Sequence, residues 1–89
     1  MSSIPEIESV NLEDEYYHVQ FNDPEKFEVI RTPDWAANVA GSVSEGAEVR
    51  MGKQKDSDDW EVESVLIEKD ETEQGAKEYA EKIVKKIQE

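Results

Sequence analysis

Apolar and polar residues alternate along four stretches of this chain with the two-residue period of a β-strand. In the first stretch Tyr17, Val19 and Phe21 share one side, and polar residues fall on the other. The pattern therefore predicts four strands, at residues 15–21, 27–31, 46–51 and 59–67.

The segment at 59–67 is the longest of the predicted strands, and it ends in the continuous apolar run Val65-Leu66-Ile67. A strand that is apolar on both sides is typical of one that is buried on both faces. We therefore expect this strand at the centre of the sheet.

A first stretch with helical periodicity follows the second strand, at residues 33–40. Thr32-Pro33-Asp34 is typical of a helix start, and Gly41 suits the position just beyond a helix end. Trp35 lies on the apolar side of this short helix, and we expect it, together with Trp60, to anchor the core.

The C-terminal stretch shows the clearest helical pattern of the chain. Asp70 with Glu73 three residues later resembles a capping box. Three Glu–Lys pairs spaced four residues apart support the exposed side of the helix. The apolar stripe that must pack on the rest of the protein consists of Ala76, Tyr79, Ala80, Ile83 and Ile87.

These elements predict one α+β domain over residues 15–89. It has a four-stranded, mostly antiparallel sheet, one short helix, and the C-terminal amphipathic helix packed on one face. In residues 1–14 a few apolar residues are scattered among acidic ones, which is typical of a loosely held, flexible N-terminal arm. Ile7, Val10 and Leu12 leave open the alternative that this acidic arm adds an edge strand.

The net charge of −13 is distributed unevenly along the chain. Residues 1–29 and 56–89 each carry a net charge of −7, whereas residues 30–55 hold both arginines and a net charge of +1. Cations that face one way can bind an acidic peptide or a nucleic-acid backbone, and a tryptophan can stack on a base. The candidate binding surface consists of Arg31, Arg50, Lys53, Lys55 and Trp60. The alternative is that these cations only offset the neighbouring aspartates.

Residues suited to catalysis or to holding a cofactor are few. There is no cysteine, and His18 is the one histidine, on the side of its strand that is expected to face solvent. The four glycines form no phosphate-binding loop. The acidic segment Asp56-Ser57-Asp58-Asp59 lacks the glycine and the third ligand of an EF-hand. We therefore expect a non-enzymatic protein with no metal or other cofactor.

The expected partner is another protein. No apolar run approaches the ~18 residues of a membrane span, and the first residues do not read as a secretion signal, so the chain is expected in the cytoplasm without a membrane partner. Strong negative charge disfavours nucleic acid. Binding of nucleic acid through residues 31–55 at high salt, where the acids are screened, is the alternative.

The acidity of the whole chain resembles that of small proteins from salt-loving archaea. Arg31–Ala37 and Glu48–Ile67 are similar to segments of short uncharacterised proteins of that group. The resemblance implies adaptation to high salt, and it carries no activity. The eight lysines are more than such proteins usually keep.

Overall fold

The computed structural model describes residues 6–69 and 71–88, which form five strands, one 3-10 turn and two α-helices. In chain order the elements are β1 (Ser9–Glu13), β2 (Tyr16–Gln20), η1 (Pro24–Lys26), β3 (Val29–Arg31), α1 (Asp34–Val43), β4 (Glu48–Lys53), β5 (Trp60–Glu68) and α2 (Glu73–Gln88).

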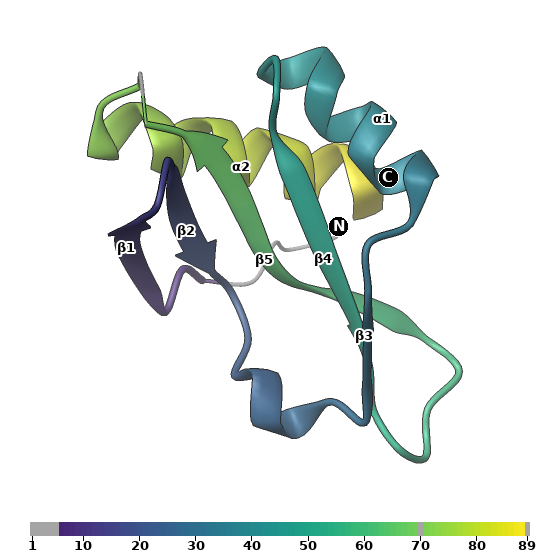
Figure 1. Cartoon of the computed structure of the whole chain (residues 1–89). Helices are drawn as coiled ribbons and strands as arrows, with labels where there is room; N and C mark the ends of the chain where they lie inside the picture. The colour runs from purple at the N-terminus through teal and green to yellow at the C-terminus, as the bar shows by residue number, and fades with distance from the viewer. Residues whose placement is uncertain (1–5, 70, 89) are drawn as a thin grey trace.

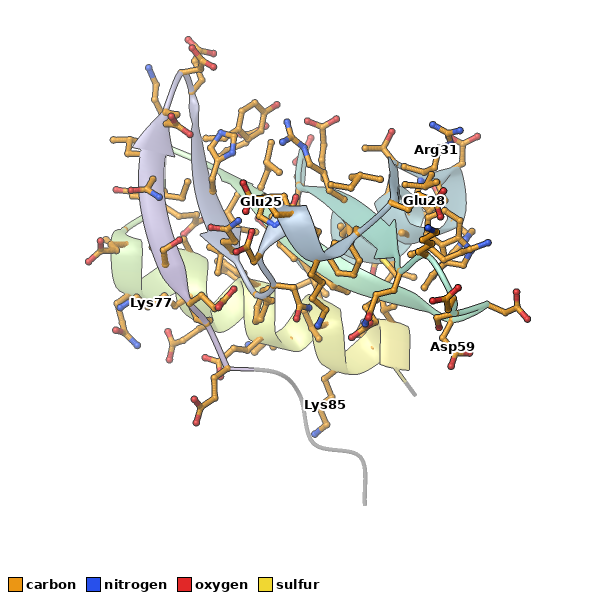
Figure 2. The ribbon with its side chains drawn as sticks, turned by 90° about the horizontal axis from the view of Figure 1, so that it is seen from below. Glu25, Glu28, Arg31, Asp59, Lys77 and Lys85 are labelled. Atoms are coloured by element: carbon orange, nitrogen blue, oxygen red, sulfur yellow. The ribbon has the colours of Figure 1, made fainter. Side chains whose placement is uncertain are left out.

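The five strands form one antiparallel sheet in the order β1-β2-β5-β4-β3. Both helices lie on the same face of this sheet, and α2 crosses it from the β2 side toward α1 (Figure 1). Seen along the sheet, α2 forms a layer of its own below the strands (Figure 2). The predicted α+β class and the packed C-terminal helix are confirmed. The central position of β5 is confirmed as well by the strand order, and Val65, Leu66 and Ile67 are all buried.

The prediction of four strands is wrong, because part of the N-terminal arm forms a fifth. Val10 of β1 lies opposite Val19 of β2 and packs against the core, so β1 covers an edge of the sheet that β2 would otherwise expose. The turn between the two strands uses Asp14 at a φ of 56°, a left-handed conformation that aspartate tolerates. Backbone pairing with β2 thus outweighs the acidic composition of the arm.

Helix α1 differs from the prediction at both ends. Pro33 occupies the N-cap position without a side-chain hydrogen bond, and the helix runs through Gly41 to Val43. The fully buried residues of α1 are Ala36 and Ala40, one turn apart, and they join the same apolar cluster as the alanines of α2. Small side chains at this position let the two helices approach closely.

Helix α2 begins after Thr72, whose Oγ1 accepts a hydrogen bond from the amide nitrogen of Gly75 (2.9 Å). Asp70, the predicted cap residue, lies outside the described residues. None of the three predicted Glu–Lys pairs forms an ion pair among the described residues of α2. The helix therefore depends on its buried stripe, of which Ile83 and Val84 are fully covered.

The core lies between the sheet and the two helices. Its fully buried sheet residues include Val19, Val49, Met51, Val62 and Ile67. No helix of the described residues covers the other face of the sheet, so polar side chains remain there beside the buried Leu66. The two faces therefore offer different chemistry.

Candidate interaction surface around two exposed tryptophans

The two tryptophans lie at the surface, and their predicted place in the core is wrong. Trp35 is 52% exposed and Trp60 is 43% exposed. Together with Pro33 they line one hollow of about 240 Å³. Large aromatic residues that share an exposed hollow are unusual on a small domain and are typical of contact sites.

The position of Trp35 follows from the face that α1 buries. Trp35 immediately precedes Ala36 and so lies about 100° around the helix from it. The first turn is held by two hydrogen bonds, because the amide nitrogens of Ala36 and Ala37 both bond to the carbonyl oxygen of Pro33 (3.1 Å each). Trp35 is therefore presented outward from a rigid backbone.

Trp60 is exposed because it opens β5 at the hairpin end of the sheet, which extends beyond α2 (Figure 1). It lies opposite Lys53 of β4 in the strand register, and Lys53 in turn lies opposite Val29 of β3. The ladder thus places a cation beside the indole on the same side of the sheet.

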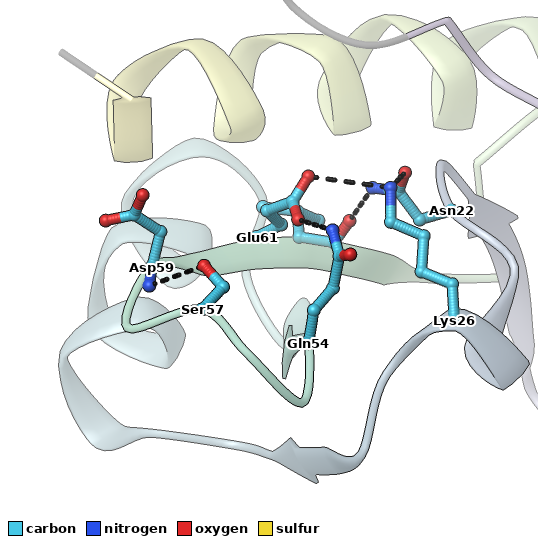
Figure 3. Close-up of polar contacts among 7 residues, drawn as sticks. Asn22, Lys26, Gln54, Ser57, Asp59 and Glu61 are labelled. Atoms are coloured by element: carbon cyan, nitrogen blue, oxygen red, sulfur yellow. Dashed lines mark hydrogen bonds and ion pairs between the residues drawn. The ribbon is translucent and has the colours of Figure 1, made fainter.

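A cluster of polar contacts fixes this end of the hairpin (Figure 3). Lys26 of η1 reaches across to Glu61 (3.6 Å) and donates a hydrogen bond to Oδ1 of Asn22 (2.9 Å). Nε2 of Gln54 donates to the other carboxylate oxygen of Glu61 (2.9 Å), and Asn22 donates to the carbonyl oxygen of Val62 (2.7 Å). These contacts hold β5 next to Trp60. Sequence reasoning missed the contacts of Asn22 and Lys26 with β5, because they join segments distant in the sequence.

Arg50 is separated from the other four predicted site residues by the sheet. Arg31 lies opposite the buried Met51, and Lys53 is two residues farther along β4, so both point to the side of the sheet that carries the helices. Arg50 is next to Met51 and points to the opposite face. Lys55 lies exposed in the loop between β4 and β5.

Acidic residues lie at the same end of the sheet as the cations near the tryptophans, without pairing with them. Glu28, Arg31 and Asp59 lie at the same end of the sheet, away from Lys77 at the start of α2 (Figure 2). Within residues 6–69 and 71–88, Arg31, Lys53 and Lys55 take part in no ion pair. Their charges are therefore available to a partner. We call this set of Arg31, Pro33, Trp35, Lys53, Lys55 and Trp60 the tryptophan surface.

The acidic loop between β4 and β5 is turned on itself by a local hydrogen bond. The amide nitrogen of Asp59 bonds to Oγ of Ser57 (3.1 Å). In the described part of the chain, no three side chains of the types that bind metals come together. The aspartates of the loop are exposed to solvent.

Comparison with known proteins gave no match: no known protein family fits the chain, and neither a curated protein nor a solved structure is significantly similar. Neither helix of the described residues is long and apolar enough to span a bilayer.

Proposed function

We propose that this domain works by binding rather than by catalysis, and that the tryptophan surface binds a segment of another protein. The observation that supports this proposal is the shared hollow of Trp35, Trp60 and Pro33. An apolar side chain of the partner fits between the indoles, and carboxylates beside it meet Arg31, Lys53 and Lys55. Tryptophan and arginine are enriched among the residues that dominate binding energy.

The size of the hollow suits a weak and reversible contact. A fully covered tryptophan buries about 150–250 Å². With about half of each indole exposed, a partner can remove roughly 100 Å² from water at each. At ~25 cal/mol per Å² the two indoles contribute about 5 kcal/mol before the cost of association. The cations orient the partner and raise the rate of association more than they raise the affinity.

A nucleic acid is the second candidate, because exposed tryptophans can stack on bases. The position of Arg50 on the other face leaves three cations beside the tryptophans. The adjoining loop carries Asp56, Asp58 and Asp59, all exposed, and these repel phosphates. The local charges therefore favour a protein segment with isolated carboxylates over a continuous phosphate backbone.

Selection of a displayed random-peptide library against the immobilised protein tests the proposal. Enriched peptides are expected to place an apolar residue next to Asp or Glu. They should bind the Trp35→Ala/Trp60→Ala double variant at least about tenfold more weakly. Leu12→Ala is the matched control, because Leu12 is 56% exposed on β1 at the opposite edge of the sheet. Circular dichroism checks that each variant is folded.

Two results would overturn the proposal. One is a set of enriched peptides that bind the double variant as tightly as the wild type. The other is saturable binding of a single-stranded or duplex oligonucleotide that the double variant loses, while no peptide is enriched. Two further variants test the role of the cations. Arg31→Gln and Lys53→Gln should each weaken binding of the selected peptides and make that binding less sensitive to salt concentration.

A further inference from the structure

A second hollow, of about 250 Å³, lies on the face of the sheet that the helices leave open. Residues from all five strands line it, so it is built on the sheet rather than on loops. Its charged lining residues are Glu13, Arg50 and Glu63, and its other polar lining residues are Asn11, His18, Gln20 and Ser64. We call it the sheet hollow. It lies across the sheet from the tryptophan surface, and the two share no residue.

The sheet hollow is centred on an irregularity in β5. Arg50 lies opposite Ser64 and Met51 lies opposite Val62, so Glu63 has no partner residue in β4. Such bulges redirect a side chain and are common beside functional sites. Here the bulge turns Glu63 into the hollow next to Ser64 instead of toward the core.

Glu63 is a carboxylate that is only 4% exposed. Its two oxygens accept hydrogen bonds from Oγ of Ser64 (3.1 Å) and Nε2 of Gln20 (3.3 Å). Gln20 is oriented in turn by Ser9, whose Oγ donates to Oε1 of Gln20 (3.1 Å). A chain of polar groups across β1, β2 and β5 thus fixes the carboxylate in place.

Both donors to Glu63 are neutral, and no described cation lies within ion-pair distance of it. A buried carboxylate without a counter-charge carries a large desolvation cost. Arg50 lines the same hollow from the adjacent strand, yet it forms no ion pair with Glu63. The hollow therefore holds one guanidinium, Arg50, and two carboxylates, the buried Glu63 and the exposed Glu13 at the rim strand β1, and none of the three forms an ion pair with another.

We propose that the sheet hollow binds a small zwitterion of the amino-acid type. The ammonium group of the ligand lies at Glu63 and supplies the missing counter-charge. The carboxylate of the ligand lies at Arg50, whose planar guanidinium suits bidentate contact with it. His18 and Asn11 provide further hydrogen-bonding groups on the wall. This site is independent of the tryptophan surface.

Backbone amide NMR spectra during titration with glycine, L-alanine and γ-aminobutyrate test the proposal. The three probes are zwitterions that differ in bulk and in the separation of their charges. At least one should cause saturable shifts of the amides of His18, Glu63 and Ser64. Methylammonium and acetate, which carry one charge each, should bind at least about tenfold more weakly.

Two variants test the two charges separately. Glu63→Gln and Arg50→Gln should each weaken binding of the responsive zwitterion by at least about tenfold. Arg31→Gln, on the other face, is the matched control and should leave binding unchanged. Arg50 is exposed, so its variant is informative even if Glu63→Gln does not fold.

The proposal is overturned if no zwitterion causes saturable shifts of these amides at about 50 mM, well above a millimolar dissociation constant. It is also overturned if both variants bind as the wild type does, or if acetate alone reproduces the shifts. The Trp35→Ala/Trp60→Ala variant should retain zwitterion binding. Failure of one proposal is thereby distinguishable from failure of the other.

Discussion

Gly52 is a position where one added methyl group should do clear harm. It lies within β4, and a Cβ atom there would overlap Cγ and Cδ2 of Phe27. Phe27 is 8% exposed, and it covers this part of the strand. Gly52→Ala therefore forces the ring to move or the strand to shift.

The cost of this substitution can be estimated from the burial of Phe27. The chain can always relieve the overlap by expelling Phe27, and losing the burial of one such side chain costs about 1.5–3 kcal/mol. Partial adjustment costs about 1–3 kcal/mol, as overpacking in other cores does. We therefore expect Gly52→Ala to lower the free energy of unfolding by about 1–3 kcal/mol, or the Tm by roughly 5–20 °C for a chain of this length.

A double-mutant cycle isolates the contact. In a Phe27→Ala background the overlap is gone, so Gly52→Ala should be nearly neutral, or stabilising by up to about 1 kcal/mol because alanine restricts the unfolded chain. Urea unfolding followed by far-UV circular dichroism measures all four proteins. Additive effects of the two substitutions would refute the reasoning, because additivity means that the ring and the added methyl group do not compete for space.

Two further predictions concern the capping of α2 and the net charge. Thr72→Ala removes the acceptor for the amide of Gly75 and should lower the free energy of unfolding by about 1 kcal/mol. Thr72→Ser keeps the hydroxyl group and should retain most of the wild-type stability. Thermal unfolding of both variants tests this. Raising NaCl from about 0.01 M to about 0.5 M should raise the urea midpoint, because screening of the −13 net charge outweighs the loss of two exposed ion pairs; an unchanged midpoint contradicts this.

Strand periodicity predicted the sheet well where burial differs between the two sides of a strand. Val19 and Phe21 are buried as expected, and Val65-Leu66-Ile67 lies in the central strand. The sequence indicates the strand around Val10 only as an alternative, because an edge strand gains its stability from backbone pairing with β2. Composition carries little signal of such pairing.

The tryptophans and the cations show a different limit of sequence reasoning. Trp35 is adjacent in sequence to Ala36, which α1 buries. The close packing of α2 against α1 favours small residues in the contact between the two helices, and the sequence of α1 alone does not reveal this packing. Arg50 and Lys53 are close in sequence, yet the alternation of β4 places them on opposite faces of the sheet. Arg31 is distant in sequence, and the register of β3 places it on the face of Lys53. The register of paired strands, rather than proximity in sequence, determines which charges act together.

Glu63 is the residue that links stability to the second proposal. An open sheet face needs polar groups, but exposed side chains meet that need without burying a charge. Replacing Glu63 with Gln removes the desolvation cost and weakens the bonds from Ser64 and Gln20, and these two effects on stability oppose each other. A carboxylate kept for ligand binding should therefore lose binding in Glu63→Gln with little change in the free energy of unfolding. If the carboxylate only fixes the bulge, Glu63→Gln should clearly lower the free energy of unfolding. The wild-type protein should then bind no zwitterion either.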